Sequence, residues 1–409
     1  MPAGFVVVGG GIAAAHCVET LRAEGYDGTL TVLAAEPRLP YDRPPLSKQV
    51  LKGEEQPDSV VLHVESWYAE HDIEVRLGVE AVALDLDGHQ VRTADGDSLD
   101  YERLLLATGS RVRTLPVPGA DLEGVVTLRT LEQSVALRDR LEQRPRVVVV
   151  GSGWIGMEAA AAGRKHGAEV TVVSPEAPMV RALGPQVSDI YAAAHRDAGV
   201  TLTIGPGIES FRGDLRVEAV VTTDGQVLPA DLVVVGVGVS PEAGLAARAG
   251  LEVDDTLGGA VVVDASLRTS DPDVFAVGDC AAWPCTPLGG RRLHVEHWAN
   301  ACDGGPVAGR SMLGQDVTHD VLPFFWSDQY ELGMEYAGHV VDPAGADLVL
   351  RGDVDAHEFM AFWLVDGAVE AGMHVNVWDT IDDVQRIIRA GGPADASRLA
   401  DASVPLSEL

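Results

Sequence analysis

Positive charge is scarce in this chain of 409 residues. It carries 30 lysines and arginines against 62 aspartates and glutamates, which gives a formal net charge of −32. Nucleic acids and anionic membrane surfaces bind proteins through basic patches, so this balance argues against both as partners. No apolar run approaches the roughly 18 residues that a membrane-spanning helix needs. The apolar stretch near the start is expected to be a strand rather than a signal peptide, so we expect a cytoplasmic protein.

Cysteine is also scarce, with four residues in the whole chain. Cys280 and Cys285 have the spacing of the redox pair of flavin disulfide reductases. In those enzymes, however, the pair follows the early strands of the flavin domain, whereas here it lies far downstream. We therefore interpret the two cysteines as small buried residues and expect no disulfide-reductase chemistry.

The chain also lacks a complete metal-binding or hydrolytic motif. His294, Glu296 and His297 resemble half of a metal site, but no third ligand has suitable spacing, and we expect no metal. The sequence offers no Ser–His–Asp arrangement that suggests nucleophilic catalysis.

Glycine, in contrast, is abundant, with 45 residues, and two glycine-rich turns follow runs rich in valine. Residues 5–8 precede Gly9-x-Gly11-x-x-Ala14, and residues 147–150 precede Gly151-x-Gly153-x-x-Gly156. Each pattern predicts a buried parallel strand that turns into a helix whose first N–H groups face a dinucleotide pyrophosphate. Two such turns imply two dinucleotides that exchange electrons. The positions expected to line the pyrophosphates are Gly9, Gly11, Ala13, Gly151, Gly153, Ile155 and Gly156.

The order of segments predicts that one nucleotide-binding domain is inserted into another. We expect an α/β fold with two Rossmann-like dinucleotide-binding domains, arranged as in glutathione reductase, and a C-terminal α+β domain. The first domain would span residues 1–114 and resume at 246–324, because the proline-rich segment 115–119 resembles a linker. The inserted domain would span 115–245, and the alternating strand patterns after residue 325 would form the last domain, 325–409.

Several single residues follow predicted strands at positions suited to a bound dinucleotide. Glu36 lies just beyond the second strand, where an acid accepts hydrogen bonds from an adenosine ribose. Thr108 and Gly109 form a turn where the backbone can approach a cofactor. Asp279 follows a buried strand and can accept a hydrogen bond from a ribityl hydroxyl, or it can cap a helix. The proline-rich stretch 40–48 is expected to be neither helix nor central strand, and to form a rigid wall against a ligand.

Taken together, the motifs resemble one family. They are the two glycine turns, Tyr41-Asp42-Arg43-Pro44-Pro45-Leu46-Ser47-Lys48, Ala107-Thr108-Gly109, Gly153-Trp154-Ile155-Gly156-Met157-Glu158, Val277-Gly278-Asp279 and Phe325-Trp326-Ser327-Asp328-Gln329. In this order they resemble the NADH-dependent ferredoxin reductases of oxygenase and cytochrome P450 systems. The resemblance spans nearly the whole chain, and the Arg-Pro-Pro-Leu-Ser-Lys and Phe-Trp-Ser-Asp-Gln stretches are its most specific parts.

The resemblance implies FAD in the first domain, NADH in the inserted domain and a [2Fe–2S] ferredoxin as electron acceptor, with an oxygenase or cytochrome P450 served indirectly. It implies that Lys48 and Glu158 pair beside the flavin, and that Glu158 contacts the nicotinamide carboxamide. A plain acid favoured by the helix dipole is the other interpretation of Glu158. The further positions that it assigns to the flavin are Arg43, Ala81, Arg129, Trp298 and Trp326.

Other functions stay open. An NAD(P)H oxidase or peroxide reductase on a similar fold usually keeps a redox cysteine after the proline-rich loop, where this chain has none. A redox-signalling flavoprotein resembling apoptosis-inducing factor is a second alternative. We expect NADH over NADPH, because Glu176 can reach the ribose and repel a 2′-phosphate, although Arg181 lies nearby. Arg291, Arg292 and Arg310 are candidates for a local basic patch that docks the ferredoxin.

Overall fold

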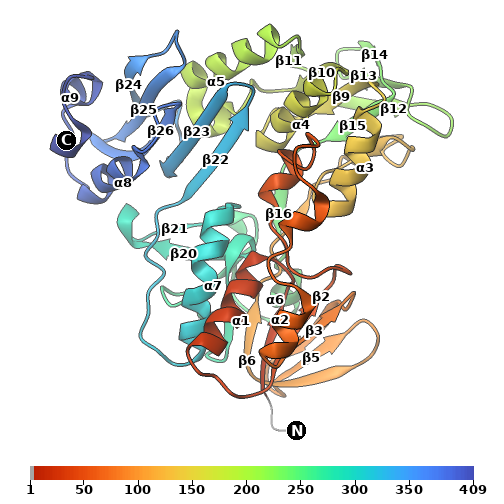
Figure 1. The fold of residues 1–409 in the computed structure, drawn as a ribbon, viewed down its shortest axis with the longest axis vertical. Helices are drawn as coiled ribbons and strands as arrows, with labels where there is room; N and C mark the ends of the chain where they lie inside the picture. Colours follow the sequence, from red (N-terminus) through yellow and green to blue (C-terminus); the bar gives the residue numbers. More distant parts are fainter. Residues whose placement is uncertain (1–3) are drawn as a thin grey trace. The chain divides into compact units, whose positions relative to one another are not determined.

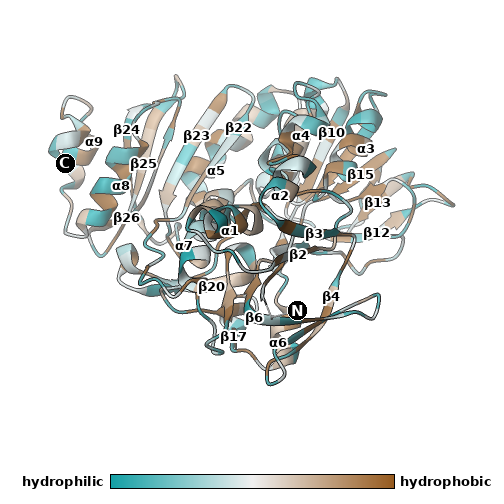
Figure 2. Cartoon of the chain, turned by 60° about the horizontal axis from the view of Figure 1, so that its bottom comes forward, coloured by the Kyte–Doolittle hydropathy of each residue, from teal (hydrophilic) through white to brown (hydrophobic). Residues whose placement is uncertain are grey.

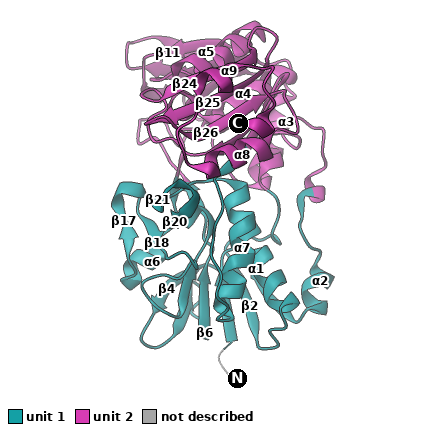
Figure 3. Ribbon diagram, turned by 90° about the vertical axis from the view of Figure 1, so that its left-hand side faces the viewer, with its two compact units in different colours: residues 1–42, 60–111, 240–325 teal, residues 43–59, 112–239, 326–409 magenta. Residues whose placement is uncertain are grey.

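The computed structural model describes residues 4–409, and the chain divides into two compact units. Unit 1 comprises residues up to Asp42, Val60–Arg111 and Ser240–Phe325, and unit 2 comprises Arg43–Ser59, Val112–Val239 and Trp326–Leu409 (Figure 3). Both units combine segments that are far apart in the sequence. In residues 4–409 no helix is long and apolar enough to cross a membrane.

The core of unit 1 is a parallel sheet whose strands follow the order β3-β2-β1-β6-β19. The two antiparallel strands β5 and β4 continue it beyond β6. The strands are buried because valine and leucine fill them on both faces, as a parallel sheet covered by helices requires. Their bounds are β1 Gly4–Val8, β2 Leu30–Ala34, β3 Ile73–Leu77, β4 Ala81–Asp85, β5 Gln90–Thr93, β6 Ser98–Leu106 and β19 Val274–Ala276.

Helices α1 (Ile12–Ala23) and α7 (Trp298–Met312) pack side by side in unit 1 (Figure 1). Small residues allow the close approach: a Cβ atom at Gly305 would lie 2.6 Å from the carbonyl oxygen of Ala13. The contact holds the first turn of α1 against the rest of the unit, and therefore fixes the glycine turn that precedes it. The remaining elements of unit 1 are α2 Glu65–Glu70, α6 Gly244–Ala249, β17 Val253–Asp254, β18 Ala260–Val262, β20 Ala281–Cys285 and β21 Arg291–Leu293.

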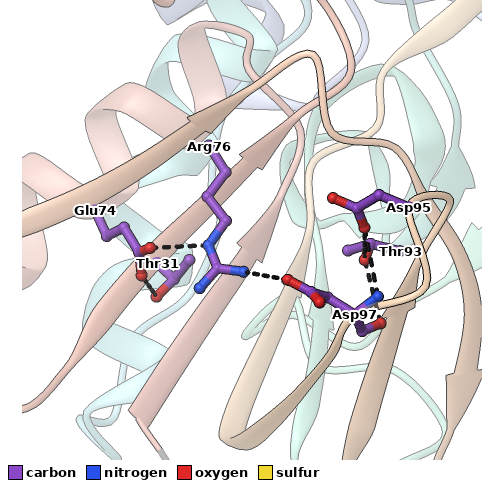
Figure 4. Close-up of polar contacts among 6 residues, drawn as sticks. All are labelled: Thr31, Glu74, Arg76, Thr93, Asp95 and Asp97. Atoms are coloured by element: carbon purple, nitrogen blue, oxygen red, sulfur yellow. Dashed lines mark hydrogen bonds and ion pairs between the residues drawn. The ribbon is translucent and has the colours of Figure 1, made fainter.

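A polar network ties the outer strands of unit 1 to the turn between β5 and β6 (Figure 4). Glu74 on β3 accepts hydrogen bonds from Arg76 at 2.8 Å and from Thr31 on β2 at 3.1 Å. Arg76 also lies 3.6 Å from Asp97 in the turn, where Asp95 accepts a hydrogen bond from Thr93 at 2.5 Å. The network is partly exposed, so its role is to orient the edge strand rather than to contribute much stability.

Unit 2 contains a second parallel sheet, in the order β11-β10-β9-β15-β8. Helix α3 begins at a capping box formed by Thr130 and Gln133, and α5 is kinked at Gly184. A small antiparallel sheet, β12-β13-β14, belongs to the same unit. The bounds are α3 Leu131–Leu141, α4 Trp154–Lys165, α5 Val180–Asp197, β8 Val125–Val126, β9 Arg146–Val150, β10 Glu169–Ser174, β11 Thr201–Ile204, β12 Ile208–Arg212, β13 Ala219–Thr222, β14 Val227–Pro229 and β15 Leu232–Val235, and the short strands β7 Ser110–Val112 and β16 Val239–Pro241 pair with each other.

The C-terminal part of the chain folds as a five-stranded sheet in the order β22-β23-β26-β25-β24, covered by α8. Helix α8 buries Val384, Ile387 and Ile388 and exposes its polar side. Its ribbon in Figure 2 is accordingly brown in part and teal in part. The bounds are β22 Phe324–Gln329, β23 Leu332–Gly338, β24 Asp347–Asp353, β25 Glu358–Val365, β26 Ala368–Val375, α8 Ile381–Ala390 and α9 Ala396–Ala400.

The predicted fold class is confirmed: two parallel dinucleotide-type sheets and a C-terminal α+β part are present. One expectation about the proline-rich stretch was wrong, because Pro44–Ser47 form a turn of 3₁₀ helix. The prolines occupy its first two positions, where a missing N–H leaves no hydrogen bond unmade. Cys280 and Cys285 are free thiols and both are buried, as expected. Each compact unit mixes segments of different predicted domains, so the domain boundaries remain a prediction.

Candidate functional site

The first glycine turn lies in unit 1, between β1 and α1. Gly9 has a φ of +133°, and a Cβ atom there would lie 2.1 Å from the carbonyl oxygen of Ala107, so only glycine fits. Gly11 is the N-cap of α1 in an extended conformation, and a Cβ atom added to it would meet nothing within 4 Å. The helix N-terminus therefore faces open space without a capping side chain, which is the arrangement that a pyrophosphate needs.

Asp279 lies beside this turn. The preceding residue, Gly278, is so placed that a Cβ atom on it would lie 3.7 Å from the Cβ atom of Ala13 in α1. The Asp279 carboxylate accepts a hydrogen bond from the Ser110 hydroxyl at 2.7 Å, and its carbonyl oxygen accepts one from His294 Nε2 at 2.8 Å. The structure thus brings together two predicted flavin positions, Ala13 and Asp279, that are far apart in the sequence.

Other predicted flavin residues of unit 1 occupy strand ends and the start of α7. Glu36 accepts a hydrogen bond from the Tyr41 hydroxyl at 2.6 Å, two residues beyond the end of β2. Trp298, the first residue of α7, donates to the Asp42 carboxylate at 2.7 Å.

The remaining three flavin positions of unit 1 lie on strand β4 and after β6. Thr108 donates to the carbonyl oxygen of Glu242 at 2.6 Å, so its hydroxyl is used within the protein and its backbone is the part left for a cofactor. Gly109 has a φ of +70°, and Ala81 is the first residue of β4.

The second glycine turn, in unit 2, repeats the geometry of the first. Gly151 has a φ of +102°, and a Cβ atom at Gly156 would lie 2.2 Å from the carbonyl oxygen of Gly151. Gly153 is the N-cap of α4, and a Cβ atom there would meet nothing within 4 Å. Ile155 in the first turn of the helix is 42% exposed, which is unusual for a large apolar side chain. The turn therefore fits a second dinucleotide.

The end of strand β10 is joined to this turn through hydroxyl groups. Ser152 in the turn lies 2.9 Å from the hydroxyl of Ser174 and 2.8 Å from the carbonyl oxygen of Glu176. The Glu176 carboxylate forms an ion pair with Arg181, with one contact at 2.8 Å. The guanidinium beside Glu176 lowers the pKa of that carboxyl group, so the acid is ionised at neutral pH. The acid that is predicted to bind the ribose, Glu176, is therefore already paired with a cation, Arg181.

Lys48 and Glu158 form a buried ion pair in unit 2. The ammonium nitrogen lies 3.0 Å from Glu158 Oε1, and the two side chains are 8% and 3% exposed. Two hydroxyl groups complete the surroundings of the carboxylate: Ser47 donates to Oε2 at 2.5 Å and Ser327 donates to Oε1 at 2.7 Å. The acid thus receives three donors from two distant segments, in the first turns of the dinucleotide-binding helix α4. The alternative of an isolated acid attracted only by the helix dipole does not describe this site.

Unit 2 also contains Trp326 and the two arginines Arg43 and Arg129. The Lys48 ammonium nitrogen is 6.0 Å from the centroid of the Trp326 ring, so Trp326 borders the ion pair. Arg43 donates to the carbonyl oxygen of Arg129 at 2.9 Å, and the backbone N–H of Arg129 donates to Gln133 at 2.8 Å. The two arginines that the family resemblance assigned to the flavin are therefore neighbours.

Beyond Ser327 the hydrogen bonds continue into the interior of unit 2. Gln329 donates to the Ser327 hydroxyl at 3.1 Å, and the amide oxygen of Gln329 lies 2.8 Å from His195 Nε2. The other imidazole nitrogen of His195 lies 3.1 Å from the Tyr330 hydroxyl. Burial lowers the pKa of His195 to about 4, and His195 and Gln329 are both 0% exposed.

Asp328 adds an acid next to this group of residues. Burial raises the pKa of its carboxyl group, and the charges of Lys48 and Lys52 oppose that rise. The charge of Lys48 therefore acts on Asp328 as well as on its ion-pair partner Glu158.

Sequence reasoning found the ion pair but missed the residues that hold it. Ser47 and Ser327 stand inside the quoted motifs, next to Lys48 and Trp326, so their positions offered a signal. His195 and Tyr330 offered none, because single polar residues on a helix and after a strand are common on protein surfaces.

The proposed basic docking patch is not supported at Arg292. Its guanidinium donates to the carbonyl oxygens of Val263 at 2.9 Å and Ala282 at 3.1 Å, so it holds strands of unit 1 together. Arg310 forms an ion pair with Glu24 at 2.8 Å, so its charge is already partly neutralised within the protein. In residues 4–409 no group of three or more acidic, histidine or cysteine side chains is placed to bind a metal ion.

Comparisons with known proteins agree with this geometry. Residues 4–305 match the family described as "Pyridine nucleotide-disulphide oxidoreductase", and residues 324–409 match the one described as "Reductase C-terminal". The ferredoxin–NAD(+) reductase component of the anthranilate 1,2-dioxygenase system of Burkholderia cepacia is 39% identical over 407 residues, which cover 98% of each chain.

Two solved structures are similar over nearly the whole chain. The ferredoxin reductase for the CYP199A2 system from Rhodopseudomonas palustris has a TM-score of 0.93 at 35% identity and covers 99% of each chain. The covalent putidaredoxin reductase–putidaredoxin complex has a TM-score of 0.92 at 35% identity, with 100% of this chain and 98% of that chain covered. The chain belongs to the pyridine nucleotide-disulphide oxidoreductase family and, within it, to the ferredoxin reductases of oxygenase and cytochrome P450 systems.

Proposed function

We propose that the protein is an FAD-dependent NADH:ferredoxin oxidoreductase that supplies electrons to an oxygenase or a cytochrome P450 through a [2Fe–2S] ferredoxin. The observation that carries the proposal is the buried pair of Lys48 and Glu158 on the helix that follows a dinucleotide turn. The names of the relatives support the choice of partner, because they include a ferredoxin–NAD(+) reductase and a reductase bound to its redox partner.

The residues of unit 1 fit FAD. The Gly9–Gly11 turn and Ala13 would hold the pyrophosphate, Glu36 the ribose and Asp279 the ribityl chain. Thr108, Gly109, Ala81 and Trp298 would border the cofactor. All of these residues would belong to a flavin domain of residues 1–114 and 246–324. The family resemblance further assigns Arg43 and Arg129 to the flavin.

The residues of unit 2 fit NADH. Gly151, Gly153, Ile155 and Gly156 would hold its pyrophosphate in a domain of residues 115–245. Glu176 would accept hydrogen bonds from the adenosine ribose, and its charge would disfavour the 2′-phosphate of NADPH.

The protein's contribution to catalysis is orientation and electrostatics. When bound, the two cofactors supply the redox chemistry, a hydride from nicotinamide C4 to flavin N5 followed by single electrons to the ferredoxin. Glu158 would accept a hydrogen bond from the nicotinamide carboxamide and so fix which face and edge of the ring are presented. Lys48 would hold the Glu158 carboxylate in place through the ion pair, with Trp326 beside the ammonium group, and the family resemblance assigns Lys48 to the flavin as well.

The test is the reduction of cytochrome c by NADH with and without an added [2Fe–2S] ferredoxin. We expect turnover to depend on the ferredoxin, with kcat/KM for NADH exceeding that for NADPH. Equal rates of NADH consumption with oxygen as the sole acceptor would instead favour an NADH oxidase. Slow turnover with a long-lived complex of reduced flavin and NAD⁺ would favour a redox-signalling flavoprotein.

A further inference from the structure

We infer that Ser327, Gln329, His195 and Tyr330 form a one-directional chain of hydrogen-bond donors that ends on the Glu158 carboxylate and positions it as an ionised acceptor. The inference rests on the proposed function only for the role of Glu158 toward nicotinamide. The chain itself rests on distances and burial within unit 2, and none of its four members was assigned a role by the sequence patterns.

The four links are short, those between Glu158 and His195 are buried, and the last one, to Tyr330, is partly buried. From the carboxylate outward they measure 2.7 Å to Ser327, 3.1 Å to Gln329, 2.8 Å to His195 and 3.1 Å to Tyr330. Glu158, Ser327, Gln329 and His195 are between 0% and 3% exposed. Water cannot replace a missing partner at such positions, so each polar atom depends on the next.

The direction of each link follows from the chemistry of the one before it. An ionised carboxylate can only accept, so the single Ser327 proton points to Glu158 and its oxygen must accept from Gln329. The amide NH₂ of Gln329 therefore faces Ser327, and its amide oxygen faces His195. His195 must then carry its proton on Nε2, which leaves Nδ1 as the acceptor for the Tyr330 hydroxyl.

A neutral His195 is a condition of this chain, because a charged imidazole has no acceptor for Tyr330. Burial supplies the condition by lowering the pKa of His195 to about 4. The charged and titratable groups facing the two ends are Lys48 and Asp328 near Glu158, with Lys52 beyond them, and Arg164 and Glu331 near Tyr330. Within residues 4–409 none of these groups hydrogen-bonds to Gln329 or His195, so the direction is set by the neutral members.

The consequence for the proposed site is electrostatic. The four dipoles are aligned and each polarises the next, which strengthens the hydrogen bond that Ser327 donates to Glu158 and restricts the rotation of the carboxylate. Ser47 and Lys48 belong to a different segment from Ser327 and bind the same carboxylate. The acid is therefore held by two segments of the chain. Ser327, Gln329, His195 and Tyr330 are thus positioning residues, and Glu158 is the group that would touch the nicotinamide.

The kinetic test uses the FAD-loaded protein and stopped-flow reduction of the flavin by NADH across pH. Ser327→Ala removes the direct donor, so the acid limb of the profile should move up by roughly one pH unit. Tyr330→Phe should move it in the same direction by less. In the Ser327→Ala background, Tyr330→Phe should have no further effect, because the chain is already cut.

Tyr191→Phe is the matched control. The Tyr191 hydroxyl lies on the same helix as His195, is buried and has no hydrogen-bond partner in the part of the chain that the structure describes. This control should leave the pH profile unchanged. If Tyr330→Phe behaves like Tyr191→Phe, or if its effect is the same with and without Ser327, the chain does not act on Glu158.

A second readout does not depend on NADH. Nitrogen-15 NMR of labelled histidine, assigned by comparison with His195→Gln, should show His195 neutral at pH 7 with its proton on Nε2. Tyr330→Phe should shift the Nδ1 resonance and leave the proton on Nε2. A proton on Nδ1, or a charged ring at pH 7, would overturn the inference even in a protein that reduces ferredoxin. Conversely, the expected tautomer in a protein that does not oxidise NADH would refute the proposed function and leave the chain standing.

Discussion

Removing one charge of the Lys48–Glu158 pair should cost more than removing both. Lys48→Met leaves a carboxylate that is 3% exposed without its cation, and Glu158→Gln leaves an ammonium group that is 8% exposed without its acid. Breaking a buried pair from one side costs about 3–5 kcal/mol, because the remaining charge stays desolvated. Each single variant should therefore lose about that much free energy of unfolding.

The double variant Lys48→Met/Glu158→Gln should lose no more than either single variant. It removes both charges while it keeps the volume of the two side chains. The amide oxygen can still accept from one of Ser47 and Ser327, and the amide NH₂ can donate to the hydroxyl oxygen of the other. The resulting coupling free energy should reach at least about 2 kcal/mol. The measurement is urea unfolding of the four FAD-loaded proteins under one set of conditions.

Lys165 provides the control, because its ion pair with Glu54 lies in the same unit with side chains 44% and 47% exposed. Lys165→Met should change stability by at most about 1 kcal/mol. Flavin reduction by NADH, measured in parallel, should slow in each single variant of the buried pair. Stabilities that add within about 0.5 kcal/mol would refute the coupling and with it the view that the two residues act as a unit.

Three further predictions concern the cofactors and acid stability. Asp279→Ala should weaken FAD binding by about 1–3 kcal/mol because a buried hydroxyl partner loses its acceptor; a flavin titration that shows unchanged affinity would remove Asp279 from the site. Glu176→Gln should free Arg181 for a 2′-phosphate and raise the kcat/KM ratio of NADPH to NADH roughly tenfold, equivalent to about 1.4 kcal/mol; an unchanged ratio would exclude the acid from specificity. Burial lowers the pKa of His195 from 6.5 to about 4, so the unfolded chain binds a proton more readily and stability should fall as pH drops from about 6.5 to about 4. His195→Gln should flatten that fall by on the order of 3 kcal/mol, as urea unfolding at several pH values would reveal.

A helix or strand could be predicted from the sequence wherever its own residues are sufficient to determine it. The valine-rich residues 147–150 predict strand β9 (Arg146–Val150), because a parallel strand covered on both faces needs apolar side chains throughout. The proline-rich stretch was misjudged because proline excludes a helix interior but permits the first positions of a short helical turn, and only the following residues decide which occurs.

The candidate site was accessible to the extent that its residues stand in motifs. Lys48 and Glu158 were found, and their contact is confirmed at 3.0 Å. The orientation of Glu158 by Ser327 depends on a partner 169 residues away, and long-range contacts leave no periodic trace in a single sequence. Arg292 shows the opposite case: it reads as a surface charge, yet two backbone carbonyl groups use it.

The surroundings of Glu158 also bear on why the C-terminal sheet accompanies the two nucleotide folds. Strand β22 contributes Ser327 to the carboxylate and Gln329 to the chain behind it, whereas α4 contributes only the acid itself. A glycine turn with a helix can bind a dinucleotide without this sheet, because the pyrophosphate contacts are local. A glutamate that is held in one orientation cannot be produced by the helix alone, since the partners of Glu158 come from distant segments of the chain. In the proposed mechanism the C-terminal sheet would therefore help to orient the hydride donor, and substitutions in β22 should alter the rate of flavin reduction before they alter the binding of NADH.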